Sequence, residues 1–142
     1  MTLSTFTTGG SSETSVAGTE YRPGVCNIGP AEVGRRRRAG QVGLLATVVS
    51  LGVLVAINAP PAARLIVGLP AAVAASGYLQ ARLRFCAGFG SRGVFNFGPL
   101  GQTQKVADGD ARAQDRSRAN QISLVSLAVG VAIGVLAVLL PL

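Results

Sequence analysis

The stretch QVGLLATVVSLGVLVAINAP, residues 41–60, decides the fold of this chain. It carries no charge, and its length of about twenty residues matches the roughly 30 Å hydrocarbon core of a bilayer. Inside a membrane the backbone must satisfy its own hydrogen bonds, so a helix is expected despite the many valines. The stretch therefore predicts a first transmembrane helix.

Two further apolar stretches indicate two more spans. Residues 63–81 are Ala-rich and contain Pro70, at which we expect a kink, and residues 121–141 are again uncharged. Pro60 and Pro61 interrupt the chain between the first two spans and predict a tight hairpin. The composition agrees, because 13% of the residues are charged, well below the roughly 25% of soluble domains.

The basic residues are concentrated on one side of the predicted membrane. Arg22 and the run 35–38 precede the first span, seven more lie between the second and third spans, and the hairpin has only Arg64. Under the positive-inside rule, the N-terminus and the loop 82–120 are cytoplasmic, while the hairpin and the C-terminus are extracytoplasmic. We therefore expect an all-α membrane protein with three transmembrane helices, a tight extracytoplasmic hairpin and a Gly-rich cytoplasmic loop.

The domain organisation follows from the same pattern. A Ser/Thr/Gly-rich flexible tail, residues 1–25, is expected to precede a three-span membrane domain, residues 26–142. The tail lacks the apolar core of a secretory signal, so insertion through the internal helices is expected. No internal repeat is evident. The preference for Arg over Lys, together with abundant Ala and Gly, suggests a bacterial plasma membrane protein.

The segment that leads into the first span, GVCNIGPAEVGRRRRAG (residues 24–40), predicts a helix at the membrane surface. Pro30 suits a first helical turn, and Glu32 would be favoured there by the helix dipole, within reach of the arginines that follow. We interpret the basic run as an anchor for anionic lipid, with a docking site for a phosphate-bearing ligand as the alternative. The run consists of Arg35, Arg36, Arg37 and Arg38.

The Gly-rich stretch CAGFGSRGVFNFG, residues 86–98, is expected to form a structured loop at the level of the lipid headgroups. Phe89, Phe95 and Phe97 would dip into the interface, and Arg92 would contact lipid phosphate. A nucleotide-binding loop is not expected, because no strand precedes the glycines and no Lys-Ser/Thr follows them. Nucleic acid is not an expected partner either, because the basic residues flank apolar runs.

Residues 106–121 mix charges of both signs at helical spacing. Asp110 is expected to cap a helix that continues into the third span. Its charged face is interpreted as solvated, with docking of a partner as the alternative. The spacing suggests two ion pairs along this face, Asp108 with Arg112 and Asp115 with Arg118.

Cys26 and Cys86 are both predicted on the cytoplasmic side, where they could meet in space. A disulfide is not expected in a reducing cytosol, and two thiols without any His leave a zinc site incomplete. We interpret the pair as packed thiols; a redox or regulatory pair, or a metal or thiol-bound group, are the alternatives. No metal site and no cofactor are predicted.

Small residues recur at four-residue spacing in two of the predicted spans. Such stripes allow the close helix contacts that hold membrane proteins together. They could face each other or face another subunit. The stripes are Gly68, Ala72 and Ser76 in the second span, and Ser126, Gly130 and Gly134 in the third.

The sequence shows no catalytic constellation. It has no His, and its carboxylates lie in expected ion pairs or in the tail, so we do not expect an enzyme. We expect a non-catalytic accessory or scaffold subunit of a membrane complex, with other membrane subunits or copies of itself as partners. Two alternatives stay open: a thiol or metal sensor using Cys26 and Cys86, and a small oligomeric channel or carrier.

Overall fold

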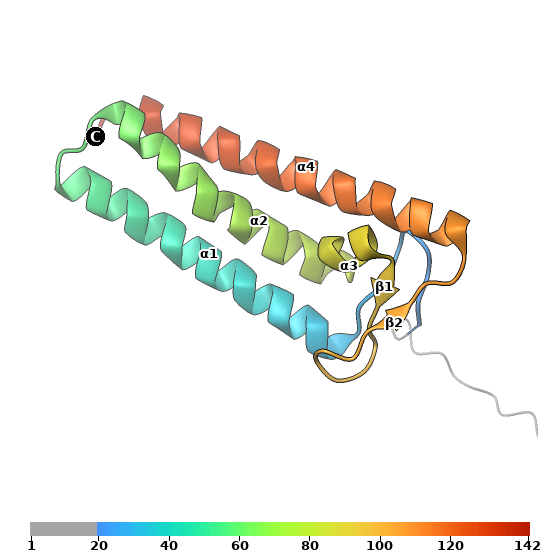
Figure 1. Ribbon diagram of the computed structural model, residues 1–142. Helices are drawn as coiled ribbons and strands as arrows, with labels where there is room; N and C mark the ends of the chain where they lie inside the picture. The colour runs from blue at the N-terminus through green and yellow to red at the C-terminus, as the bar shows by residue number, and fades with distance from the viewer. Residues whose placement is uncertain (1–19) are drawn as a thin grey trace, which may run out of the picture.

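The computed structural model describes residues 20–142, so most of the predicted flexible tail, residues 1–19, lies outside the described part of the chain. The described chain is mostly helical (Figure 1). Three of its helical segments are long and apolar enough to cross a membrane, which confirms the predicted number of helices of spanning length. They are α1 (Pro30–Ala56), the continuous pair η1 (Pro61–Val67) and α2 (Gly68–Leu83), and α4 (Gly109–Leu139).

The three segments form a layer that is one helix thick. The helix α2 lies in the middle, with α1 on one side and α4 on the other (Figure 1). Large aliphatic side chains on the outer surfaces of all three are exposed, as expected for helices whose solvent is lipid. The layer therefore has no central core of the kind that a soluble helical bundle buries.

Small residues allow α2 to approach α1 on one side and α4 on the other. A Cβ atom added to Gly43 of α1 would lie 2.6 Å from the backbone nitrogen of Ala74. On the opposite side of α2, a Cβ atom added to Gly68 would lie 2.5 Å from the carbonyl oxygen of Gly130 in α4. Lipid gives helices little hydrophobic reason to associate, so this close backbone contact is what stabilises the layer.

The hairpin between α1 and α2 is built from a short 3₁₀ helix. Asn58 has a positive φ of 52° after the end of α1, and η1 begins at Pro61. Pro70, at which we expected a kink, lies in the first turn of α2, and the chain changes from a 3₁₀ helix to an α-helix directly before it. Arg64 is buried and donates to the carbonyl oxygens of Leu140 and Leu142, which ties the hairpin to the end of α4.

The opposite end of the layer carries a compact cap, which we define as residues 20–29 and 84–108. It contains the short helix α3 (Ala87–Arg92) and an antiparallel pair of two-residue strands, β1 (Val94–Phe95) and β2 (Gln104–Lys105). The predicted Gly-rich loop is therefore folded, and α4 begins at Gly109, close to the start that we expected for a helix capped by Asp110.

Candidate functional site

Two copies of the motif Asn-x-Gly-Pro lie side by side at the centre of the cap. Residues 27–30 and 96–99 both carry it, and the two segments run parallel. The backbone nitrogen of Asn96 donates to the carbonyl oxygen of Asn27 (3.0 Å), and Gly29 donates to the carbonyl oxygen of Asn96 (2.8 Å). This short repeat contradicts our expectation that the chain has none. Four-residue motifs are easily overlooked, and only their pairing in space distinguishes this one.

The side chains of Asn27 and Asn96 are both buried, and both form hydrogen bonds with the backbone of the cap. The amide of Asn27 pairs with both backbone groups of Cys86: it accepts from the nitrogen (2.7 Å) and donates to the oxygen (3.1 Å). The amide of Asn96 accepts from Gly98 (2.9 Å) and donates to the carbonyl oxygen of Pro99 (2.8 Å). The Cys86 oxygen also accepts from Gly90 at the start of α3, and the two amides supply the further partners that short segments with little regular structure need.

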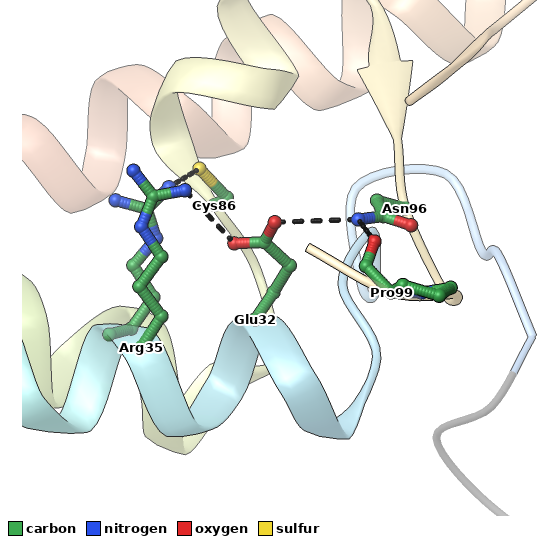
Figure 2. A network of polar contacts seen from close by, with 6 residues as sticks. Glu32, Arg35, Cys86, Asn96 and Pro99 are labelled. Carbon is green, nitrogen blue, oxygen red and sulfur yellow. Dashed lines mark hydrogen bonds and ion pairs between the residues drawn. The ribbon is translucent and has the colours of Figure 1, made fainter. Parts of the chain in front are cut away.

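Glu32 is a buried carboxylate in the first turn of α1 (Figure 2). One carboxylate oxygen lies 3.8 Å from the guanidinium of Arg35, and the other accepts from the side chain of Asn96 at 3.4 Å. The position agrees with the favourable dipole at a helix N-terminus. Glu32 therefore connects α1 to the second Asn-x-Gly-Pro segment.

Arg36 differs from the other arginines of its run. Arg35, Arg37 and Arg38 are exposed, whereas Arg36 is half-buried, because it precedes Gly40 by four residues on the face of α1 that contacts α2. Its guanidinium donates to the sulfur of Cys86 (2.8 Å). It also lies 6.0 Å from the centre of the Phe89 ring. The sequence offered the helical period as a signal, but we treated the four arginines as equivalent.

Both cysteines are free and buried. Asn27 brings the backbone of Cys86 next to the segment that carries Cys26, but each thiol has a partner of its own. The thiol of Cys26 donates to the carbonyl oxygen of Ile28 at 3.8 Å, and burial raises its pKa. Within residues 20–142, no three side chains of His, Cys, Asp or Glu gather in a way that could hold a metal ion.

The aromatic side chains of the cap contact protein atoms. Phe89 is buried and packs with Ile28 and Cys86, and Arg92 lies 5.6 Å from the centre of its ring. This differs from our expectation that Phe89 dips into the membrane interface, because the short helix α3 turns the ring inward. Phe95 stacks on Tyr21 with ring centres 4.7 Å apart. The ring of Phe97 in turn lies 6.1 Å from that of Phe95.

Asp115 fixes the N-terminal part of the cap to α4. It is fully buried and accepts from the hydroxyl of Tyr21 and from the backbone nitrogen of Gly24, each at 2.7 Å. The expected pair of Asp115 with Arg118 is therefore wrong, and residues 20–25 of the predicted tail are packed against the helix. Burial and the bond to Asp115 raise the pKa of Tyr21.

The N-cap of α4 is Asp108. Its side chain accepts from the backbone nitrogens of Asp110 and Ala111, so Asp110, the residue we expected to cap, lies inside the first turn. A cap at Asp108 satisfies two of the backbone donors that a helix N-terminus leaves open. The helix then runs without a break from the cap into the third apolar stretch.

A groove runs along one face of the layer, below the cap. Its upper part is an open hollow of about 380 Å³ that α2 floors and that α1 and α4 flank. Its lower part is a hollow of about 180 Å³ between α2 and α4. The polar residues that line the upper part are Arg36, Ser76, Gln80, Ser123 and Ser126. The lower part is lined mainly by aliphatic side chains and glycines.

Some residues of the predicted small-residue stripes form the contact between α2 and α4, and the others line the groove. Gly68 and Ala72 of α2 face Gly130 of α4, and Gly134 packs against Leu65 and Gly68, so the two stripes meet over these residues. The remaining members, Ser76 and Ser126, line the upper groove. We did not predict the matching contact of α1 with α2, although Gly40, Gly43, Ala74 and Gly77 are visible in the sequence at helical spacing.

The chain matches no protein family, no curated protein and no solved structure in the three comparisons that we made.

Proposed function

We propose that this protein is a non-catalytic accessory or scaffold subunit of a membrane complex, with its cap on the cytoplasmic side of a bacterial plasma membrane. The observation that carries the proposal is the single-layer arrangement of the helices. Within its apolar stretch α1 is 11% buried, against 28% for each of the other two spans. A helix that contacts only one neighbour leaves most of its surface for lipid or for another membrane protein.

The outer face of α1 is the surface that we assign to a partner subunit. It presents aliphatic side chains on both sides of Gly52, at which an added Cβ atom would meet nothing within 4 Å. Exposed small residues between aliphatic ridges allow close approach of another transmembrane helix. The cap supports this role, because its bonds to Glu32 of α1 and Asp115 of α4 fix the positions of these two helices at one end of the layer.

The orientation rests on the distribution of basic residues. The arginine run and the other cap-end cations lie together, and Arg64 at the hairpin end is occupied by carbonyl groups of the α4 terminus. Cations near a transmembrane end favour the cytoplasmic side. The thiol-sensor alternative is less well supported, because reactive cysteines need access and the exposed fractions of Cys26 and Cys86 are 3% and 1%.

The test is a mild-detergent pull-down of the tagged chain from its native membrane, with mass spectrometry of the proteins retained. Val49 on α1 and Val125 on α4 are matched, with exposed fractions of 53% and 51%. We expect a stoichiometric membrane protein with wild type and with Val125→Trp, and its loss with Val49→Trp. A lone protein or a simple homo-oligomer in all three preparations would overturn the proposal.

A further inference from the structure

The two hollows of the groove adjoin each other along the layer. They share Ala72 and Leu127 as lining residues. Along α4 the lining extends from Ser123 to Gly134, which is about 16 Å at the rise of an α-helix. Half of a typical hydrocarbon core is about 15 Å. Along η1 and α2 the lining extends from Leu65 to Gln80, which is about 22 Å at the same rise, so the groove is at least as long as one leaflet.

The groove is polar at its upper end and apolar at its lower end, as the binding of an amphiphile requires. The upper end has a guanidinium and hydroxyl groups, and the lower end is lined by Leu65, Leu69 and Val131. The hydroxyls of Ser123 and Ser126 already donate to carbonyl oxygens one turn earlier in α4. The serines can therefore face lipid without an unsatisfied donor, and Arg36 is the group at this end that still needs a partner.

The charge of Arg36 is not compensated by the protein. No carboxylate of residues 20–142 forms an ion pair with it, in contrast to Arg35. Its one hydrogen bond in the described chain goes to a thiol sulfur, which is a weak acceptor, and its buried Nε has no partner. The ring of Phe89 and the sulfur of Cys86 nevertheless hold the guanidinium in place. A positioned guanidinium without a counterion suits a phosphate oxygen.

From this geometry we propose that the groove is a binding site for one anionic phospholipid. The phosphate lies against Arg36, and one acyl chain follows the groove past Leu127 toward Leu65. The site is independent of the proposed partner on α1, because it opens between α1 and α4 over α2. Charge complementarity at one end and an apolar hollow at the other distinguish it from the general lipid contact of the exposed arginines.

The experiment uses the full chain reconstituted in phosphatidylcholine vesicles with and without phosphatidylglycerol, extracted in mild detergent and examined by native mass spectrometry. The charge variant is Arg36→Gln, and its matched control is Arg37→Gln, which removes an exposed charge from the same helix. The groove variant is Leu127→Trp, and its control is Leu124→Trp. Both leucines are exposed, at 59% and 67%, and of the two only Leu127 lines the groove.

We expect one retained phosphatidylglycerol for wild type and for both controls. Retention should fall about fivefold for Arg36→Gln, the effect of removing one cation near an anionic headgroup. Retention should also fall for Leu127→Trp, which narrows the groove without touching the cap. Arg36→Lys should restore part of the binding. Should Arg36→Gln fail to fold, Leu127→Trp still tests the site.

Three outcomes would overturn the proposal. Equal loss with Arg36→Gln and Arg37→Gln would mean diffuse attraction of anionic lipid by the whole run. Equal retention of phosphatidylcholine would mean that the groove is filled by any acyl chain. Displacement of the lipid by inorganic phosphate alone would mean that the site recognises a free anion and that the apolar groove adds nothing. None of these measurements requires the partner complex, so they leave the proposed function untouched.

Discussion

The cap and the helix layer are held together by opposite means. In the layer the contacts depend on missing side chains, as where Gly68 lies against the backbone of Gly130. In the cap they depend on particular side chains that bond to backbone, as where Asn27 pairs with both backbone groups of Cys86. Helices in lipid satisfy their own backbone and need only close approach. The short segments of the cap have little regular structure, so their buried backbone groups require individual partners.

The largest expected effect comes from breaking the layer at a glycine. A leucine in place of Gly68 would drive its Cβ atom against the carbonyl oxygen of Gly130. We expect a loss of about 3 kcal/mol in the free energy of unfolding, the upper range for overpacking a tight contact. The thermal melting midpoint of the purified protein in detergent should fall accordingly.

The matched control for this change is Gly52→Leu. A Cβ atom at Gly52 meets nothing within 4 Å, so the same substitution on the outer face of α1 should leave the melting midpoint nearly unchanged. If both variants melted together, the stability of the layer would come from helix propensity and not from close contact. The distinction between the layer and the cap would then lose its physical basis.

The next effect separates the cap from the layer. Replacing Asn27 with Ala leaves the buried nitrogen of Cys86 without its partner and removes one of the two donors to the Cys86 oxygen, which still accepts from Gly90. A buried unpaired group costs about 1–3 kcal/mol, so we expect a loss of about 2 kcal/mol that is confined to the cap. Hydrogen exchange should accelerate for residues 84–92 and remain slow in the middle of α2. The control is Asn120→Ala, because Asn120 is exposed on α4.

The same difference explains which features the sequence could predict. The spans follow from run length and charge, which are properties summed over many residues. The apolar stretches 41–60, 63–81 and 121–141 therefore located the three long helices without knowledge of any contact, although α1 already ends at Ala56. The stripe of Gly68 and Gly130 is periodic and could also be identified. The exact first and last residues of each helix were harder to predict. At the start of α4, for example, Asp108 and Asp110 are both suitable N-cap residues, and the structure uses Asp108.

The cap could not be derived from the sequence in this way. The partners of Asn27 and Asp115 lie 59 and 91 residues away in the chain, and no local pattern indicates them. Asp115 has the helical spacing of a surface ion pair with Arg118, and its burial depends on where residues 20–25 lie. For Arg36 a local signal did exist, because its position one turn before Gly40 places it on the packed face of α1.

A smaller effect is expected at the contact between the N-terminal segment and α4. Asp115→Asn keeps the shape but removes the charge that accepts from Tyr21 and Gly24. We expect a loss of about 1–2 kcal/mol, the range for hydrogen bonds to a charged group. Limited proteolysis should cut near residues 20–25 more quickly. Asp110→Asn, at an exposed position in the same helix, should not change the cleavage rate, and equal cleavage of both would contradict the assigned role of Asp115.

The smallest effect is a pH dependence that belongs to the cap alone. The folded state raises the pKa of Tyr21 above its ordinary value of 10.0, through burial and through the bond to Asp115. The stabilisation from the protonated phenol is therefore complete below pH 10 and is lost as the pH rises beyond that value. Hydrogen exchange of residues 20–29 should accelerate above this pH, while exchange in the middle of α2 stays slow.

Tyr21→Phe is the variant that isolates this dependence. It removes the hydroxyl and so costs the cap about 1 kcal/mol at neutral pH, the net contribution of a single hydrogen bond. It retains the stacking of the ring on Phe95. At neutral pH, residues 20–29 of the variant should therefore be slightly less protected from hydrogen exchange than in wild type. Their protection should not fall further between neutral and alkaline pH. An alkaline transition that persists in Tyr21→Phe would assign it to another group and would separate the stability of residues 20–29 from the Tyr21–Asp115 bond.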